Sequence, residues 1–289
     1  MKTLFNLLIT VFLLLLISGC KDDETLSQDV TVDIPDTNFL NALIENGVDI
    51  NLDGVITESE AGDIFELNIA GKEILDLTGI EKFYNLTNLD CSYNYLNKLD
   101  LAKNKNLGLL KCAGNALNKN LDVSNCLRLG YLDCSHGTIE ELDLTNNNQL
   151  RYLQCHSNKL NTIDLSNNQE LTILYIFDNP LYELDITNNQ KLKELNFSGW
   201  FSNIDLSKNT QLEDFVLRDS WEIYTLDLSK NTSLKRIAFY DTFLLTQVCV
   251  WTEDFPPTNL SLEISYSDPP PYGFPQGNPS NIVFTTECN

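Results

Sequence analysis

The stretch Leu86–Asn106 reads LTNLDCSYNYLNKLDLAKNKN, and a similar phrase begins again at Leu107. Eight copies follow one another at intervals of 20 to 22 residues, beginning at Leu86, Leu107, Leu129, Leu150, Leu171, Leu192, Leu212 and Leu234. Each copy holds two short runs in which apolar and polar residues alternate, as in Leu89-Asp90-Cys91 and Leu99-Asp100-Leu101. Alternation points every second side chain of a strand to the same side. We therefore expect repeated coils whose apolar residues share one core.

This period and the pattern LxxLxCxxNxL resemble those of leucine-rich repeat proteins. In such a solenoid, one coil cannot bury its apolar face until its neighbours stack on it. We predict a leucine-rich repeat solenoid over residues 64–248, mainly β, with two short parallel strands per coil in two sheets. Ile64–Ile69 is interpreted as an irregular opening coil.

Cysteine recurs at one inward position of the early copies. It is found as Cys91, Cys112, Cys134 and Cys155, and the later copies have Ile176, Phe197, Leu217 and Phe239 there. Because large apolar residues replace the thiol, we predict that these cysteines are core residues and not metal ligands or redox groups. The chain contains no CxxC spacing that would indicate a zinc site.

Asparagine recurs at two turn positions, where a buried amide could bond the backbone of its own coil and of the neighbouring one. The first position holds Asn94, Asn115, Asn158 and Asn179, with Gly137, Trp200, Ser220 and Thr242 as exceptions. The second holds Asn104, Cys126, Asn147, Asn168, Asn189, Asn209 and Asn231. We expect two amide ladders, with Cys126 as a substitute in the second one and not a reactive thiol.

A column of aspartates is expected to point outward from the second run of each copy. It consists of Asp100, Asp122, Asp143, Asp164, Asp185, Asp205 and Asp227. In-register strands would stack these carboxylates about 4.8 Å apart, where like charges repel. Two interpretations remain: each carboxylate accepts hydrogen bonds from the turn that follows it, or the column binds cations.

Residues 49–60, DINLDGVITESE, fill every position of the EF-hand loop template. The predicted calcium ligands are Asp49, Asn51 and Asp53 through their side chains, Val55 through its carbonyl, Thr57 directly or through water, and Glu60 through both carboxylate oxygens. Because only one such loop is evident, we predict one structural calcium ion and not a sensor. Thr57 and Glu60 also match a capping box, so a polar helix start without calcium is the alternative.

The loop belongs to a predicted helical N-terminal cap over residues 35–63. A helix is expected before the loop, starting at a cap on Asp36 or Thr37 and ending near Gly47.

The first twenty residues combine Lys2, an apolar run from Leu4 to Ile17, and Cys20. This pattern predicts an export signal over residues 1–19. Residues 17–20 resemble a bacterial lipobox, which implies a lipidated Cys20 that anchors the chain to a membrane. An ordinary signal with an incidental cysteine is the alternative.

Residues 21–24, KDDE, resemble the surface-export signal of Bacteroidetes lipoproteins. Residues 20–34 are predicted to form a tether, and the alternative for residues 21–24 is that they only keep this tether solvated. We predict a lipid-anchored protein of the outer membrane that faces the cell exterior.

The order IPDTNFL, DINLDGVITESEA and GKEILDLTGIEKFYNLTNLDCS resembles the leucine-rich repeat surface lipoproteins of Bacteroidetes. Relatives of that type are interaction modules and adhesin-like proteins, so the resemblance implies binding of a partner. Family members that end in a similar cysteine imply a disulfide between Cys249 and Cys288, which would close a C-terminal cap over residues 249–289. An exported protein permits a disulfide, and two free thiols are the alternative.

Charge and motifs exclude several classes of function. The formal net charge of -22, without a basic stripe, argues against nucleic-acid binding. The chain has two histidines, His136 and His156, and neither belongs to a Ser/His/Asp order or a zincin motif. We predict that the protein is not an enzyme.

Aromatic residues gather at outward positions of the first strands. Tyr131, Tyr152 and Ile173 form one column; Tyr175 and Phe177 lie beside it, and His136 and His156, both expected to point outward, flank it. Exposed aromatic clusters mark interaction sites, although tyrosine and phenylalanine also suit strands whatever they touch. The favoured function is a protein-binding or adhesive module. A glycan-binding lipoprotein and a structural envelope component with a periplasmic partner are the alternatives.

Overall fold

The computed structural model describes residues 29–267 and 282–288. The chain divides into two compact units, residues 1–30 and 31–289. Only Asp29 and Val30 of the first unit are described, so the fold below is that of the second. The predicted signal peptide, Cys20 and residues 21–24 lie outside the described residues. Within the described ranges, no helix is long and apolar enough to cross a membrane.

Two helices begin the second unit. Helix α2 (Thr37–Glu45) is capped by Asp36, whose carboxylate accepts hydrogen bonds from the amides of Asn38 and Phe39. This selects Asp36 over Thr37 as the cap. The helix buries Phe39, Ala42 and Leu43, and the chain leaves it through Gly47 at a φ of 75°. The five-residue helix α3 (Glu58–Gly62) begins at Thr57 with the expected capping box.

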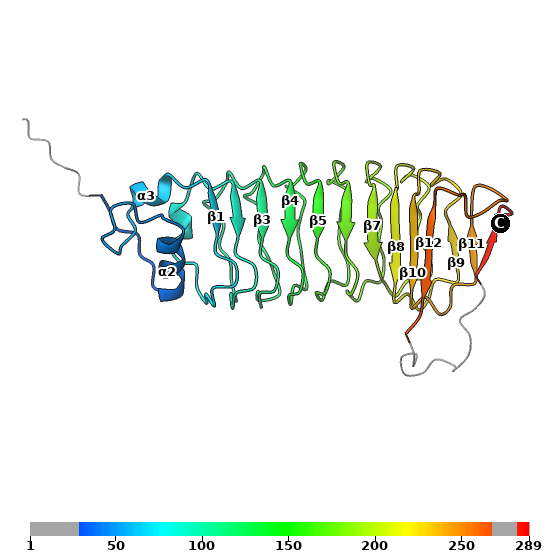
Figure 1. The fold of residues 1–289 in the computed structure, drawn as a ribbon, viewed down its shortest axis with the longest axis horizontal. Coiled ribbons are helices and arrows are strands. Elements are labelled where there is room, and N and C mark those ends of the chain that lie inside the picture. Colours follow the sequence, from blue (N-terminus) through cyan, green and yellow to red (C-terminus); the bar gives the residue numbers. More distant parts are fainter. Residues whose placement is uncertain (1–28, 268–281, 289) are drawn as a thin grey trace, which may run out of the picture. The chain divides into compact units, whose positions relative to one another are not determined.

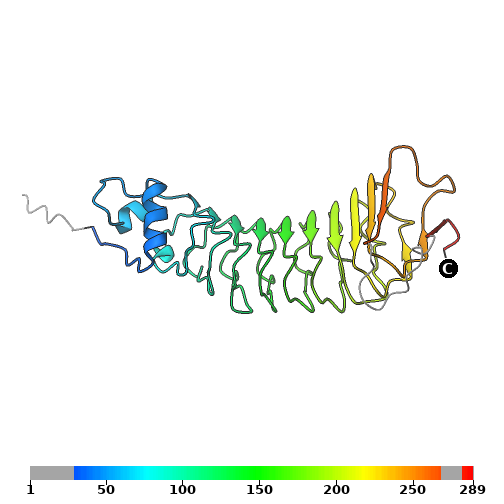
Figure 2. The ribbon, with the colours of Figure 1, turned by 60° about the horizontal axis from the view of Figure 1, so that its bottom comes forward.

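A ten-stranded parallel sheet forms the main body of the solenoid (Figure 1). Its strands, in spatial order, are β1 (Glu66–Asn68), β2 (Asn88–Asp90), β3 (Leu109–Lys111), β4 (Tyr131–Asp133), β5 (Tyr152–Gln154), β6 (Ile173–Tyr175), β7 (Glu194–Phe197), β8 (Asp214–Arg218), β10 (Arg236–Tyr240) and β12 (Ser261–Ser265). The predicted opening coil is confirmed, because β1 pairs in parallel with β2. In Figure 2 these strands lie along one side of the coils and the second-half turns along the other.

The second sheet is shorter than the sequence predicts. It contains β9 (Thr225–Asp227), β11 (Gln247–Cys249) and β13 (Val283–Thr285), in the order β13-β11-β9. Among the described residues, the second run of the earlier coils adds no strand to this sheet and leads into a turn in which Asp100 Oδ1 accepts a hydrogen bond from the amide of Ala102 at 3.0 Å. A 3-10 helix, η1 (Ile80–Lys82), occupies this place near the start of the solenoid.

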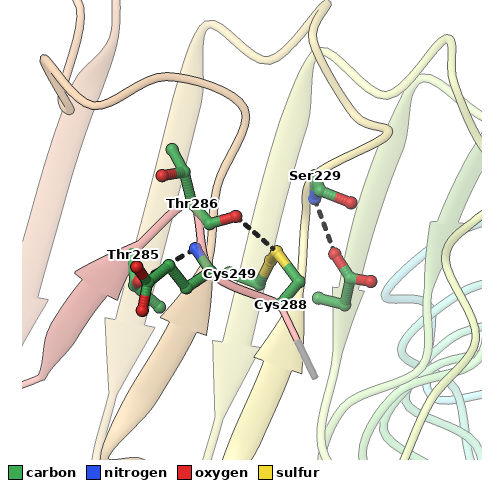
Figure 3. Close-up of a disulfide and its surroundings, with 7 residues drawn as sticks. Ser229, Cys249, Thr285, Thr286 and Cys288 are labelled. Atoms are coloured by element: carbon green, nitrogen blue, oxygen red, sulfur yellow. Dashed lines mark hydrogen bonds between the residues drawn. A yellow bond between two sulfur atoms is a disulfide. The ribbon is translucent and has the colours of Figure 1, made fainter.

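The repeat ladder continues past the predicted boundary at residue 248. Strand β12 pairs with β10, and β13 pairs with β11. The C-terminal segment therefore adds one strand to each sheet. The predicted disulfide is confirmed: Cys249, in β11, is bonded to Cys288, just after β13, with the two Cα atoms 5.6 Å apart (Figure 3).

The four aligned cysteines lie in the core, as predicted. Cys91, Cys112, Cys134 and Cys155 are buried free thiols, and the apolar residues at the equivalent place in later coils are also buried. Burial raises the pKa of Cys91 to about 12, so this thiol stays protonated at neutral pH.

Both amide ladders are present, and each joins neighbouring coils. In the first, Asn115 Nδ2 donates to the carbonyls of Cys91 and Cys112, and its Oδ1 accepts from the amide of Leu96. In the second, Asn168 Nδ2 donates to the carbonyls of Leu144 and Asn147. Cys126 is fully buried in this second ladder, and its Sγ lies 3.9 Å from the carbonyl oxygen of Asn104.

The aspartate column follows the first of its two interpretations. One oxygen of each carboxylate accepts a hydrogen bond of 2.8 to 3.0 Å from the amide two residues later, at Ala102, Ser124, Thr145, Ser166, Thr187, Ser207 and Ser229. Hydrogen bonds from the hydroxyl and from the amide of the Ser or Thr two residues later lower the pKa of Asp122, Asp143, Asp164, Asp185 and Asp205. Each aspartate therefore holds the turn that follows it through one of its two carboxylate oxygens.

Candidate interaction surface

Three tyrosines form a continuous row of rings over β4, β5 and β6. Strand pairing places Tyr131 opposite Tyr152, and their rings stack with centroids 4.1 Å apart at an interplanar angle of 8°. Tyr175 lies opposite Gln154, and its ring meets Tyr152 edge to face with centroids 6.0 Å apart. All three side chains are half-buried. We call these three residues the tyrosine row.

A second row runs beside the first and contains His136, His156 and Phe177. The ring of His156 stacks on Phe177, with centroids 4.2 Å apart, and meets His136 edge to face at 4.7 Å. His136 is exposed, but His156 is only 6% exposed. His156 is buried although it was expected to point outward, because the rings of His136 and Phe177 on the adjacent coils pack against it.

Hydrogen bonds hold the two rows in place. The Tyr152 hydroxyl donates to Gln154 Oε1 at 2.7 Å, Gln154 Nε2 lies 2.9 Å from His156 Nε2, and the Tyr175 hydroxyl donates to Glu194 Oε2 at 2.5 Å. Burial and the nearby Glu194 raise the pKa of Tyr175, and burial with the neighbouring His136 lowers the pKa of His156. At neutral pH the rings of Tyr152, Tyr175 and His156 are therefore uncharged and held by hydrogen bonds.

Basic side chains extend both rows. Lys111 Nζ lies 5.9 Å from the ring centroid of Tyr131. The guanidinium of Arg218 lies between Phe177 and Tyr240, 5.1 and 4.5 Å from their centroids. Distances of this size permit cation–π attraction.

Sequence reasoning did not include Gln154, Arg218 or Tyr240 in this surface. A signal for the last two was present: Arg218 and Tyr240 stand six residues after the first leucine of their copies, as His156 and Phe177 do. Alignment of the copies at this offset identifies His156, Phe177, Arg218 and Tyr240, whereas His136 stands one residue later in its copy.

The predicted calcium loop has a compact backbone with its oxygen atoms turned inward. The amide of Asp53 donates to Asp49 Oδ1 at 3.2 Å and to Asn51 Oδ1 at 2.9 Å, and the amide of Gly54 donates to Asp49 Oδ2 at 2.9 Å. Gly54 adopts a φ of 84°, which explains glycine at this position of the template. Glu60 crosses the loop, because its Oε1 accepts from the amide of Ile50.

The donor chemistry of the loop suits calcium, which prefers carboxylate, amide and carbonyl oxygens. Val55 and Thr57 also belong to the loop, and Thr57 Oγ1 donates to Glu60 Oε2 at 2.9 Å. In the described part of the chain, one group of three or more Asp, Glu, His or Cys side chains has ligand atoms that all lie within 4.8 Å of one another. That group consists of Asp227 and the two disulfide cysteines, so the carboxylates of the loop lie farther apart than this. The loop would have to tighten to hold the ion with all its predicted ligands.

No protein-family model matches the chain. Among solved structures, it is similar to the functional domain of internalin J from Listeria monocytogenes, which includes a cysteine ladder. The TM-score is 0.60 with 26% identity, covering 84% of this chain and 63% of that one. The chain is a leucine-rich repeat protein.

Two further comparisons agree with this leucine-rich repeat fold. Internalin C2 from Listeria monocytogenes shares the fold at a TM-score of 0.62 and 22% identity, with 75% of this chain and 99% of that one covered. Internalin J of Listeria monocytogenes serotype 4b (strain F2365) is 35% identical over 70 residues. That match spans 24% of this chain and 8% of the relative's length.

Proposed function

We propose that this leucine-rich repeat protein is a cell-envelope lipoprotein that binds a protein partner, or adheres to one, through the tyrosine row and the residues beside it. The observation that carries the proposal is the unbroken sequence of ring contacts from Tyr131 to Tyr175 on the outer face of the sheet. Rings that are already ordered lose little conformational freedom on binding, so their burial contributes more of its free energy to affinity.

Several observations support an interaction module over an enzyme. The chain shares the leucine-rich repeat fold of the internalin relatives, and its aromatic face resembles the hot-spot composition of interfaces. The two histidines contact each other and Phe177, and His156 Nδ1 lies 3.1 Å from Ser157 Oγ. These contacts give the histidines a packing role.

Substitution of the tyrosine row tests the proposal. A variant with Tyr131, Tyr152 and Tyr175 replaced by serine is compared with a control in which the exposed Tyr93, Tyr95 and Tyr224 are replaced by serine. Both are screened with the wild type against a panel of extracellular and periplasmic proteins and on a glycan array.

We expect the wild type and the control to bind a protein with similar affinity, and the row variant to bind at least about tenfold more weakly, a loss of about 1.4 kcal/mol. Equal binding by all three proteins would refute the role of the row. Binding on the glycan array alone would favour the glycan alternative.

The cellular location is part of the proposal. A lipid on Cys20 would hold the chain at the outer membrane, and export past it would expose the sheet to the exterior. Protease treatment of intact cells, with a periplasmic protein as control, should digest this chain and leave the control intact. Protection of both would favour the structural envelope component with a periplasmic partner.

We also propose that the loop at residues 49–60 binds one structural calcium ion. The ligands would be Asp49, Asn51, Asp53, Val55, Thr57 and Glu60, and the ion would hold the loop against α2 and α3. Calcium should raise the melting temperature of the wild type and of an exposed-carboxylate control, Glu73→Gln, but not that of Glu60→Gln. An unchanged wild-type melting temperature in the presence of a chelator would contradict the site.

A further inference from the structure

A hollow of about 330 Å³ lies on the turns that follow the first-sheet strands of three coils. Its lining includes Asp178, Pro180, Ser198, Trp200, Asp219 and Trp221. Asp178 and Asp219 stand seven residues after the first leucine of their copies, and Gly199 takes that place in the coil between them. We call this feature the tryptophan hollow.

The core does not account for the aromatic lining. Trp200 stands where other coils place a ladder asparagine, yet it is 52% exposed, and Trp221 is 39% exposed. The interior of this coil is filled instead by Phe201, whose ring stacks with Phe197 at a centroid distance of 6.1 Å. Tyr182 meets Trp200 edge to face, with centroids 6.0 Å apart. Trp200, Trp221 and Tyr182 thus present partly exposed aromatic surface at this edge of the molecule.

The two carboxylates of the hollow differ from those of the aspartate column. Within residues 29–267 and 282–288, neither the Asp178 nor the Asp219 carboxylate accepts a hydrogen bond or forms an ion pair, although the amide of Asp178 donates to Ser198 Oγ at 2.8 Å. Arg218, next in sequence to Asp219, holds its guanidinium between the rings of Phe177 and Tyr240. The negative charge of the hollow therefore lacks a direct partner.

Electrostatics at Asp219 agree with this geometry. The pKa of Asp219 is raised, first by partial loss of hydration at its carboxylate and second by the nearby Asp241. The residue as a whole is nevertheless exposed. Arg218 opposes this shift and Asp178 adds to it. A positive group placed in the hollow would relieve the repulsion between these carboxylates.

We propose that the tryptophan hollow binds an organic cation that carries an alkylammonium group. The indole rings of Trp200 and Trp221 would contact the methylene and ammonium groups, and Asp178 and Asp219 would neutralise the charge. A bare calcium ion fits poorly, because it requires six to eight oxygen ligands. A neutral sugar could stack on the rings but would leave the two carboxylates uncompensated. This site uses none of the residues of the tyrosine row, so it stands or fails independently of the proposed function.

Intrinsic fluorescence tests the proposal, because the chain has three tryptophans and two of them line the hollow. The full chain carrying Trp251→Phe, which keeps a ring against Phe255, leaves Trp200 and Trp221 as the emitting groups. It is titrated with Nα-acetyl-lysine methylamide, with choline, with the uncharged Nα-acetyl-norleucine methylamide, and with glucose and N-acetylglucosamine. Tighter binding of the lysine probe would identify a protein side chain as the source of the cation, and tighter binding of choline would identify a free amine.

We expect a saturable change with a cationic probe and none with the norleucine probe or the sugars. The double substitution Asp178→Asn and Asp219→Asn should weaken cation binding by about tenfold or more, and the exposed control Glu253→Gln should leave it unchanged. Asparagine tolerates the positive φ angles of 55° and 43° at these two positions, so the double variant should fold. A second variant, Trp200→Phe, should weaken binding less, because it keeps a smaller ring. Equal binding of the norleucine probe or a sugar, equal binding by the double variant, or no saturable change with any probe would overturn the proposal.

Discussion

Replacement of Asn168 by alanine should destabilise the solenoid far more than the same change at the adjacent Asn167. Asn168 is fully buried, and its Nδ2 donates to the carbonyls of Leu144 at 3.2 Å and Asn147 at 2.9 Å. Both carbonyls belong to the preceding coil, so this side chain links two coils. Asn167 is exposed on the same turn.

The size of the effect follows from these bonds. Each hydrogen bond of this kind contributes about 1 kcal/mol, and the smaller side chain also leaves a cavity. Asn168 Oδ1 is buried and has no hydrogen-bond partner in the described part of the chain. Removing this unpaired oxygen is favourable and offsets part of the loss of stability. We expect Asn168→Ala to lower the free energy of unfolding by about 2 to 3 kcal/mol and Asn167→Ala by less than about 0.5 kcal/mol.

Cys126 provides a test in the opposite direction. It fills the same ladder position with a thiol that is 3.9 Å from the Asn104 carbonyl oxygen, too long for a strong bond. Cys126→Asn should restore two donated bonds and raise stability by up to about 1 kcal/mol.

Urea unfolding followed by circular dichroism and by tryptophan fluorescence measures all three variants, and agreement of the two probes checks that unfolding is cooperative. Surface substitutions change the free energy of unfolding by up to about 0.5 kcal/mol. If Asn168→Ala and Asn167→Ala lowered it by amounts that differ by less than this, the ladder would not be a stabilising link between coils.

Three further predictions concern other parts of the fold. Folding lowers the pKa of His156 below its usual value of about 6.5, so the unfolded chain takes up the proton first as pH falls. The free energy of unfolding should therefore decline below pH 6.5. His156→Phe should abolish this decline when urea titrations at pH 7 and pH 5 are compared. Joint replacement of Cys249 and Cys288 by serine opens a crosslink between residues 39 apart and should lower stability by about 2 to 4 kcal/mol, with no loss contradicting the closing role of the disulfide. Phe239→Ala, at a fully buried position, should cost about 3 to 5 kcal/mol in the same assay, and a cost below about 1 kcal/mol would place this ring outside the core.

The repeat made much of the interior predictable. A residue at the same inward position of every coil has the same kind of surroundings in each. The apolar Ile176 and Phe197 at this position of later copies therefore predict that Cys91 and its equivalents are buried. The ladder function of Asn168 follows in the same way, since a turn amide between stacked coils has backbone carbonyls within reach. These predictions needed only the period and the chemistry of each side chain.

Features that depend on contacts between different columns were harder to predict. The burial of His156 results from Phe177, at the same offset of the next copy, together with His136, at a different offset of the preceding copy. Over the described ranges, the second sheet is confined to β9, β11 and β13, and the aspartate turn bond does not explain this, because Asp227 in β9 forms the same bond as Asp100. The sequence does not predict strand β12, although Asn259 and Leu260 begin a phrase similar to the earlier copies, because the segment after Cys249 is assigned to a disulfide-closed cap.

The tryptophan hollow could not be predicted from the sequence either. Trp200 was seen as a break in the asparagine ladder, but the position of Asp178 and Asp219 around Gly199 depends on stacking across three coils. Within a single copy, neither aspartate differs from an ordinary turn residue.

Site-specific photocrosslinking tests the central claim most directly. A photoreactive phenylalanine analogue is placed at Ile173, which lies opposite Tyr152 on the open face of the sheet, or at the exposed Asn167 on the turn of the second half. Intact cells are irradiated in their natural medium, and mass spectrometry then identifies the proteins crosslinked to this chain. We predict that position 173 crosslinks to one defined protein, that position 167 does not, and that replacing Tyr131 and Tyr175 by serine removes the product. The same products from both positions, or no product from position 173, would contradict a protein-binding role for this face.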